Sequence, residues 1–288
     1  MRSCVIISNP DAGRRPTPSL PRIVEALARR GISATARVTA GPGDATRLAG
    51  EAVRAGAELI LVHGGDGTVN EALQPLVGGP TPLAVWPGGT ANVLARELGL
   101  PRDLEPLAET VAAGRLRRVS VGRAGERYFL LMAGVGLDAA LVRAVSPRLK
   151  RLTGEGAYWV AGLTELAHWH PRRFVVEIDG RQHAATFAVI ANAASYGGGL
   201  RLAPRARMDD DLLDYCLFDW TERRRFLRYL AAGFSGSHLG LPGVTYRQAG
   251  RATAHGGEDV AVHVDGELSG SLPMSFECAP AALSLVVP

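Results

Sequence analysis

The stretch His63-Gly64-Gly65-Asp66-Gly67-Thr68-Val69-Asn70-Glu71 decides the fold of this chain. It follows an apolar run at residues 59–62 that predicts a buried strand, and it precedes a helical pattern at residues 72–76. Glycines at such a junction let the backbone approach a ligand closely, and the helix N-terminus that follows attracts an anion. The junction therefore predicts a phosphate-binding loop. The alternative is an ordinary turn in which Asp66 or Thr68 caps the helix.

A second glycine-rich junction follows the next apolar run. Residues 83–86 are strand-like, residues 93–98 have a helical pattern, and the sequence Pro87-Gly88-Gly89-Thr90-Ala91-Asn92 joins them. Two such junctions in one parallel sheet place both loops at the same sheet edge, where open α/β sheets bind ligands. The pair predicts one ligand site made from two loops.

The pattern of apolar runs changes near residue 118 and predicts two domains. Residues 1–118 alternate between strands and helices, which predicts a doubly wound parallel sheet. The strands are expected at 4–8, 33–39, 59–62 and 83–86, and the helices at 20–30, 44–55 (with Asp44 as N-cap), 69–77, 91–98 and 104–113. Residues 119–288 contain short β-type runs, which predict a mostly antiparallel β-sandwich. Those runs are 119–121, 127–132, 173–178, 181–191, 213–218, 252–254, 260–264 and 275–277, with helical stretches at 147–168 and 221–232.

These motifs together resemble the catalytic domain of the diacylglycerol kinase family, and in particular its bacterial soluble lipid kinases, which are related to sphingosine and ceramide kinases. Besides the two glycine-rich junctions, the resemblance covers three segments in the family's order: Asn9-Pro10-Asp11-Ala12-Gly13; Tyr196-Gly197-Gly198-Gly199 with Pro204 and Asp209-Asp210-Asp211-Leu212-Leu213-Asp214; and Val264-Asp265-Gly266-Glu267. The motifs are specific for the superfamily and not for one lipid.

The resemblance implies an ATP- and Mg²⁺-dependent kinase of lipid metabolism. Such an enzyme transfers the γ-phosphoryl group to a lipid hydroxyl, with diacylglycerol as the first candidate in phospholipid biosynthesis. Two alternatives stay open: a sphingoid or ceramide-type kinase, and a non-catalytic regulator that binds lipid or nucleotide on the same fold. NAD kinases share the GGDGT core, but the later motifs argue against them. By resemblance, the last residues are expected to pack back on the first domain.

Phosphoryl transfer requires groups that hold the nucleotide phosphates. The chain has no Gly-x-x-x-x-Gly-Lys-Ser/Thr loop, so the GGDGT turn is expected to do this through its backbone N–H groups. Asp66 is expected to organise the loop or the nucleotide–magnesium complex, and Asn92 either holds the second loop or caps a helix. The predicted nucleotide-binding residues, several of them by resemblance, are Asn9, Thr39, Gly64, Gly65, Asp66, Gly67, Thr68, Glu71 and Thr90.

The reaction also needs a base for the acceptor hydroxyl. By resemblance, one acid of the Asp-Gly-Glu turn removes the proton, and we predict Glu267 as the general base with Asp265 beside it. The alternative is a turn with exposed acids, as we predict for Asp179-Gly180. A base in the second domain and a nucleotide site in the first imply an active site in the cleft between them.

The acidic segment could bind a hard cation through oxygen ligands. By resemblance, a structural magnesium is held by Asp210 and by the carbonyls of Arg207 and Leu212. Asp211 stands where the family has glycine, so a positive φ there would carry modest strain. A solvated acidic turn is the alternative. Val93 stands where many relatives have Asp.

Composition bounds the partners and the compartment. The chain has 288 residues, a net charge of +4 and no nucleic-acid-binding motif, so we expect no nucleic-acid partner. Cys4, Cys216 and Cys278 form neither a metal nor a disulfide pattern, which fits a reducing compartment. Neither a signal peptide nor a membrane span is visible, so we expect a cytoplasmic protein with peripheral membrane association. The oligomeric state is open, with a homodimer as one option.

A lipid at the membrane surface is the expected partner. Residues 223–225 and Arg228 form either an interfacial basic patch or a solvated helix face. The acceptor pocket is expected in the β domain, with Tyr158, Trp159, Leu163 and Phe234 as candidate lining residues that are equally consistent with an ordinary core.

Overall fold

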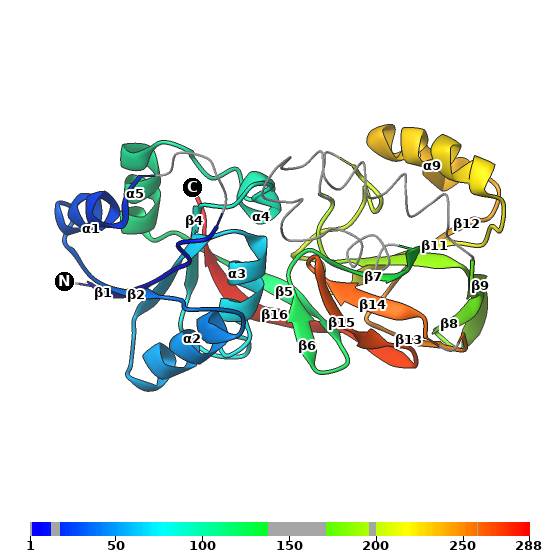
Figure 1. The fold of residues 1–288 in the computed structure, drawn as a ribbon, viewed down its shortest axis with the longest axis horizontal. Helices are drawn as coiled ribbons and strands as arrows, with labels where there is room; N and C mark the ends of the chain where they lie inside the picture. Colours follow the sequence, from blue (N-terminus) through cyan, green and yellow to red (C-terminus); the bar gives the residue numbers. More distant parts are fainter. Residues whose placement is uncertain (1, 13–17, 138–170, 196–199, 258) are drawn as a thin grey trace. The chain divides into compact units, whose positions relative to one another are not determined.

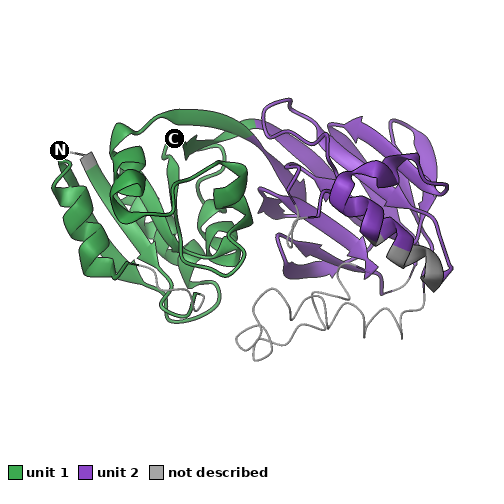
Figure 2. Cartoon of the chain, turned by 90° about the horizontal axis from the view of Figure 1, so that it is seen from above, with its two compact units in different colours: residues 1–119, 281–288 green, residues 120–280 purple. Residues whose placement is uncertain are grey.

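The chain divides into two compact units, Met1–Val119 with Ala281–Pro288, and Ser120–Pro280 (Figure 2). The computed structural model describes residues 2–12, 18–137, 171–195, 200–257 and 259–288, and only the backbone of residues 2, 223–227 and 230. The predicted helix at 147–168 lies outside the described residues, as do Tyr158, Trp159 and Leu163.

The first unit is built on a parallel sheet, as the alternating pattern predicts. Its strand order is β2-β1-β3-β4-β16, and each neighbouring pair is parallel (Figure 1). In β16 the residues from Ala281 onward belong to this unit, and Leu285 pairs with Leu83. The strands are β1 (Arg2–Ser8), β2 (Ile32–Val38), β3 (Leu59–Gly64), β4 (Leu83–Pro87) and the end of β16 (Met274–Val286).

Helices cover this sheet because alternate residues of each buried strand point to opposite faces. One face packs on α1 and α5, where Ile23 and Leu27 meet Leu107 and Val111 over Trp86. α2 and α3 lie against each other, since Thr46 donates to the backbone carbonyl of Glu71. The helices are α1 (Leu20–Ala28), α2 (Asp44–Arg54), α3 (Asp66–Leu73), α4 (Val93–Glu97) and α5 (Leu104–Ala113).

One predicted helix cap and one predicted helix start are wrong. Helix α2 begins at Asp44 itself, with Gly43 as N-cap, and the Asp44 carboxylate instead accepts the N–H of Ala40 at 2.7 Å. Helix α3 begins at Asp66 and not at residue 69. Asp66, Gly67 and Thr68 therefore form the first helical turn, which leaves their N–H groups without an intrahelical carbonyl partner.

The second unit is the predicted antiparallel β-sandwich. One sheet has the order β12-β11-β10-β7-β14-β15 and the other contains β16-β13-β8-β9, with the hairpin β5–β6 beside β16. The strands are β5 (Leu116–Ala124), β6 (Arg127–Phe129), β7 (Met132–Gly136), β8 (Phe174–Ile178), β9 (Arg181–Ala185), β10 (Phe187–Ala191), β11 (Leu213–Phe218), β12 (Val244–Ala249), β13 (Arg251–His255), β14 (Ala261–Val264) and β15 (Glu267–Ser271). α9 (Arg223–Ser235) and the 3₁₀ turn η2 (Ser237–Gly240) follow β11.

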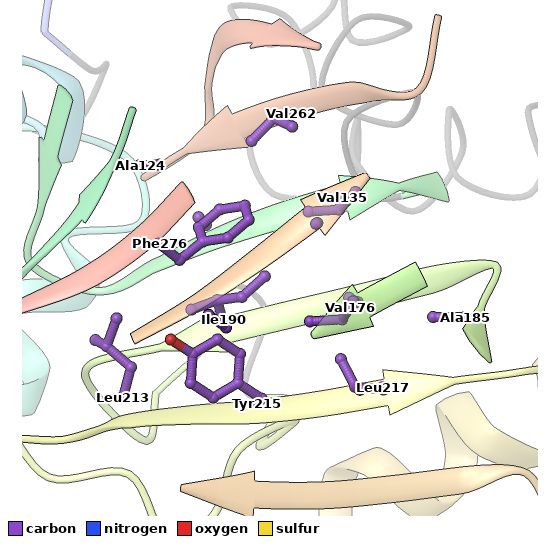
Figure 3. Packing of buried hydrophobic residues seen from close by; sticks show 14 of the residues in the cluster. Ala124, Val135, Val176, Ala185, Ile190, Leu213, Tyr215, Leu217, Val262 and Phe276 are labelled. Atoms are coloured by element: carbon purple, nitrogen blue, oxygen red, sulfur yellow. The ribbon is translucent and has the colours of Figure 1, made fainter. Parts of the chain in front are cut away.

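The core of this unit lies between its two sheets. Figure 3 shows Val135, Ile190 and Tyr215 of one sheet and Val176 and Phe276 of the other in the same buried cluster. All five residues are almost fully buried. Successive side chains on a strand point to opposite faces of its sheet, and these five belong to the faces that meet in the core.

One predicted strand is divided in two. The run 181–191 forms β9 and β10, which belong to different sheets. The break is at Thr186, whose hydroxyl donates to the carbonyls of Phe218 at 3.1 Å and Trp220 at 2.8 Å. Strands β12 and β15 have no counterpart in the sequence prediction, because neither is apolar on both faces. No helix in the described residues is long and apolar enough to cross a bilayer.

Candidate functional site

The two glycine-rich loops lie side by side in the first unit, as the sequence predicts. Gly88 donates its N–H to the carbonyl of Gly64 at 2.8 Å. A Cβ on Gly89 would lie 2.5 Å from the Cα of Gly65, and one on Gly64 would lie 2.8 Å from the Thr68 side chain. Glycine is required at position 89 because the backbones of the two loops touch there, and at position 64 because the Thr68 side chain occupies the space of a Cβ. The loops therefore form one surface at the N-terminus of α3.

Asp66 ties the two loops together. Its carboxylate accepts the N–H groups of Val93 at 3.0 Å and Leu94 at 3.1 Å, the first two residues of α4. It thereby caps a helix that begins 27 residues further along the chain. Because the contacts are to backbone N–H groups, they do not depend on the side chain at position 93. Of the two predicted roles for Asp66, organisation of the loop is the one seen directly.

Asn92 holds the second loop. It is left-handed, with φ 47°, and its amide exchanges two hydrogen bonds with the backbone of Gly89, at 2.8 and 2.7 Å. It makes no capping hydrogen bond with its side chain, so holding the loop is its observed role. Thr90 lies between these two residues and is half-buried.

The Asn9 loop joins the same surface. The Asn9 amide donates to the Thr68 hydroxyl at 3.0 Å, and its backbone N–H donates to the carbonyl of His63 at 2.9 Å. Thr39 follows β2 and donates its N–H to the carbonyl of Ser8 at 2.9 Å. The structure thus brings Asn9, Thr39 and Thr68 to neighbouring strand ends, where the sequence predicts the nucleotide-binding residues.

His63 is a neutral, hydrogen-bonded part of this region. Its Nδ1 lies 3.0 Å from the Ser8 hydroxyl, and burial lowers the pKa of the imidazole. Glu71 contacts helix α2: its carboxylate accepts the N–H of Ala45, in the first turn of that helix, at 3.2 Å. A contact between Glu71 and nucleotide stays a prediction.

Gly89→Ala is expected to cost about 1–3 kcal/mol of stability, the usual range for overpacking, and to raise the KM for the ATP that the resemblance implies. The added methyl would meet the Gly65 backbone, which cannot move aside as a flexible side chain could. Urea unfolding and initial rates against ATP concentration measure the two effects. Gly250→Ala is the matched control, because a Cβ there meets nothing within 4 Å. An unchanged KM in Gly89→Ala would show that the contact between the loops does not shape the site.

The Asp-Gly-Glu motif is the turn of the β14–β15 hairpin. Val264 pairs with Glu267, and both central residues have positive φ, 46° at Asp265 and 85° at Gly266. Positive φ at both central residues defines a type I′ turn, for which Asp-Gly is one of the preferred pairs. Asp179-Gly180 forms a turn of the same kind, with φ 49° and 73°, between paired Ile178 and Arg181. Asp179 and Gly180 are both exposed, as predicted.

Asp265 differs from Asp179 in what its carboxylate contacts. Its two oxygens accept three backbone N–H groups, from Leu130 at 2.9 Å and from Leu131 and Met132 at 3.0 Å each. The Asp265 N–H also donates to the Met132 carbonyl at 2.9 Å. This carboxylate is an anchor of the hairpin, and its oxygens are occupied by the protein itself.

Glu267 makes a different contact. Its side chain is 36% exposed, and one oxygen, Oε2, pairs with the guanidinium of Arg127. The two acids therefore face different partners, Asp265 three backbone N–H groups and Glu267 a guanidinium. The sequence prediction did not include Arg127, because no motif marks it.

The acidic segment forms a tight loop before β11. Asp210 accepts the Leu212 N–H at 3.2 Å, and Asp209 pairs with Arg207 at 3.0 Å. Asp211 does have the positive φ anticipated for the family's glycine, 59°, and its carboxylate accepts the Ser120 hydroxyl at 2.6 Å. The substitution therefore keeps the glycine-like backbone, and the bond to Ser120 stabilises it.

This loop offers hard oxygen donors that suit magnesium. In the described part of the chain no three His, Cys, Asp or Glu side chains gather as they would around a metal held by side chains alone. A cation there would depend on the Asp210 carboxylate and on backbone carbonyls, which is the donor set that the resemblance implies.

Asp214 differs from Asp209 and Asp211, which are both exposed. It is fully buried, and it accepts hydrogen bonds from Tyr246 at 2.6 Å and Gln248 at 3.4 Å. Burial raises the pKa of the Asp214 carboxyl despite these bonds. A raised folded-state pKa contributes stability below the unfolded value near 3.9, and this contribution is lost as pH rises through the folded value.

Asp214→Asn is therefore expected to gain stability relative to wild type as pH increases. The amide keeps an acceptor for Tyr246 and never acquires the buried charge. Urea midpoints for both proteins from pH 4 to pH 8 measure the difference, which should widen with pH. A difference that narrows over this range would contradict the raised pKa.

The remaining predicted lining residue and the basic cluster lie on α9. Phe234 is exposed at 48%, so it is not a core residue of this unit. Arg228 is exposed, and the side chains of residues 223–225 lie outside the described part. The prediction of an interfacial patch stays open.

The fold and these loops define a class: a parallel-sheet unit with two glycine-rich loops at one sheet edge, followed by a β-sandwich unit. Comparison with known proteins agrees with that class. Residues 3–124 match the family model of the diacylglycerol kinase catalytic domain, and residues 132–287 match that of the YegS C-terminal NAD kinase beta sandwich-like domain. The chain belongs to the diacylglycerol kinase catalytic-domain family.

Relatives cover nearly the whole chain. A diacylglycerol kinase of Bacillus subtilis (strain 168) is 32% identical over 283 residues, 96% of this chain and 93% of that protein. One of Mycobacterium tuberculosis (strain ATCC 25618 / H37Rv) is 34% identical over 272 residues, 91% of this chain and 87% of that protein. The crystal structure of a diacylglycerol kinase from Bacillus anthracis str. Sterne aligns with a TM-score of 0.79 at 24% identity, covering 100% of this chain and 97% of that chain, which supports the fold.

Proposed function

We propose that this protein is an ATP- and Mg²⁺-dependent lipid kinase that transfers the γ-phosphoryl group to a lipid hydroxyl, with diacylglycerol as the acceptor. The observation that carries the proposal is the paired-loop surface at the N-terminus of α3. Relatives named diacylglycerol kinase that match over nine-tenths of this chain support the choice of acceptor.

The phosphates of ATP bind at the first turn of α3. The N–H groups of Asp66, Gly67 and Thr68 have no intrahelical partner, and a helix N-terminus favours negative charge. The close approach of Gly65 and Gly89 holds the second loop beside this helix N-terminus. Thr68 adds a hydroxyl that Asn9 holds in place at 3.0 Å.

Glu267 accepts the proton of the lipid hydroxyl. The hydroxyl oxygen then forms its bond to the γ-phosphorus while the bond to the bridging oxygen of ADP breaks, and Glu267 later releases the proton to water. Asp265 does not compete for this role because its oxygens already accept three N–H groups.

Magnesium, when bound with ATP, neutralises charge that develops on the phosphoryl oxygens. Asp66 lies within the first glycine-rich loop, and its bonds to Val93 and Leu94 hold that loop against the second. A second, structural ion would be held by Asp210 with the carbonyls of Arg207 and Leu212, and it would stabilise the loop before β11.

The acceptor is a membrane lipid, so the protein works in the cytoplasm at the membrane surface as a peripheral protein. Exposed Phe234 and Arg228 on α9 suit contact with lipid and with anionic head groups. Cosedimentation with vesicles that contain or lack anionic lipid checks this part of the proposal.

The test is transfer of label from ATP into defined lipids. The purified chain is incubated with labelled ATP, Mg²⁺ and micelles that contain diacylglycerol, sphingosine or ceramide, with and without EDTA. We expect label in diacylglycerol alone, and loss of transfer in EDTA. Label in sphingosine or ceramide would change the acceptor class. Bound ATP without any labelled lipid would favour a non-catalytic regulator.

A further inference from the structure

One short segment of the second unit holds both acids of the Asp-Gly-Glu turn. The backbone N–H groups of residues 130–132 hold the Asp265 carboxylate, and the side chain of Arg127, three residues earlier, holds Glu267. The segment from β6 to the start of β7 is therefore a cradle for the hairpin turn. Asp265 fixes where the turn lies, and Arg127 fixes where its second acid points.

The ion pair between Arg127 and Glu267 has the properties of a positioning contact. The side chains are 29% and 36% exposed, so the pair is only partly screened by water. The guanidinium donates to one oxygen of the carboxylate, Oε2. A planar guanidinium fixes the orientation of a carboxylate better than a flexible ammonium does.

The strand that carries Arg127 is itself firmly held. Gly122 of β5 pairs with Phe129, and a Cβ on Gly122 would lie 2.1 Å from the Phe129 ring. The ring thus lies directly over a glycine and is fully buried. Arg127, two residues before Phe129, pairs with Ala124 on the same hairpin. The guanidinium extends from a rigid strand, so it can hold Glu267 in one place.

We propose that Arg127 is a positioning residue for phosphoryl transfer, which acts through Glu267. It occupies Oε2 and turns Oε1 toward the acceptor hydroxyl. The inference rests on the proposed function, in which Glu267 is the base. It assigns no contact between Arg127 and ATP or lipid.

Arg127→Gln tests the role against a matched control. Arg123 lies on the same hairpin and forms the same kind of ion pair with Glu277, which lies outside the Asp-Gly-Glu turn. We expect Arg127→Gln to lower kcat about tenfold to a hundredfold, part of the roughly 10²–10⁴-fold that a general base contributes. The KM for ATP should stay within about twofold, because the phosphate loops are untouched. Arg123→Gln should match wild type, and Arg127→Lys should recover part of kcat.

A second measurement separates positioning from a general structural effect. In the Glu267→Gln background, adding Arg127→Gln should leave the residual rate unchanged, because a residue that acts through Glu267 has nothing left to position. A further fall in the double variant would overturn the inference, and so would equal kcat losses in Arg127→Gln and Arg123→Gln. If Glu267→Gln itself keeps full activity, the proposed base is wrong and the inference falls with it. If Glu267→Gln loses activity while Arg127→Gln keeps wild-type kcat, only the positioning role is wrong.

Discussion

Replacing Glu267 by Gln is expected to lower kcat for lipid phosphorylation by about 10²–10⁴-fold, the usual contribution of a general base. Glutamine keeps the length and one oxygen for Arg127, but it does not accept the hydroxyl proton. The KM for ATP should change little, because in the proposed mechanism Glu267 acts on the acceptor hydroxyl and makes no contact with the nucleotide. Initial rates over a range of ATP concentrations measure both constants.

The control for this prediction is Asp179→Asn. Asp179 lies in the same type of Asp-Gly turn and is exposed, so its loss should leave kcat unchanged. A Glu267→Gln rate within about threefold of wild type would be far outside the range for a general base and would rule Glu267 out.

Asp265→Ala is expected to have the largest effect on stability, about 3–5 kcal/mol, because each buried N–H left without a partner costs about 1–3 kcal/mol and the three lie together. Leu130, Leu131 and Met132, which donate these bonds, are all buried. Activity should fall as the hairpin loosens. Asp265→Asn, which keeps one acceptor oxygen, should lie between wild type and Asp265→Ala. Urea unfolding followed by circular dichroism measures the change.

Asp179→Ala separates the hydrogen bonds from the backbone strain. Both acids have a left-handed backbone, φ 46° at Asp265 and 49° at Asp179, so alanine carries a similar strain in either turn. The difference between the two variants then reports the three N–H bonds. Equal losses would mean that these bonds contribute little and that Asp265 is not an anchor.

These two Asp-Gly turns also show what the sequence can and cannot predict. In both, the dipeptide between strand-like runs predicts the turn, because its residues accept positive φ. What distinguishes Asp265 is the backbone of residues 130–132, which lies more than 130 positions earlier in the chain. No local pattern carries that information. Arg127 is missed for the same reason, since its partner is set by how the hairpins pack.

The first unit was more predictable because its signals are local. Buried strands, glycines and helices alternate in order, so both loops and their common edge follow from the sequence. The start of α3 does not, since Asp66 and Gly67 are poor helix formers that the tertiary structure places in the first turn. The link from Asp66 to α4 is likewise tertiary. In the second unit, the division of 181–191 depends on Thr186 meeting carbonyls of β11 and Trp220.

We propose that this chain moves the terminal phosphoryl group of ATP to a lipid hydroxyl. The most direct measurement compares ATP labelled in the γ-phosphate with ATP labelled in the α-phosphate, each incubated with the protein, Mg²⁺ and diacylglycerol micelles. We expect label in the extracted lipid from γ-labelled ATP and none from α-labelled ATP. No lipid label from γ-labelled ATP, under conditions where the protein binds ATP, would contradict the proposal.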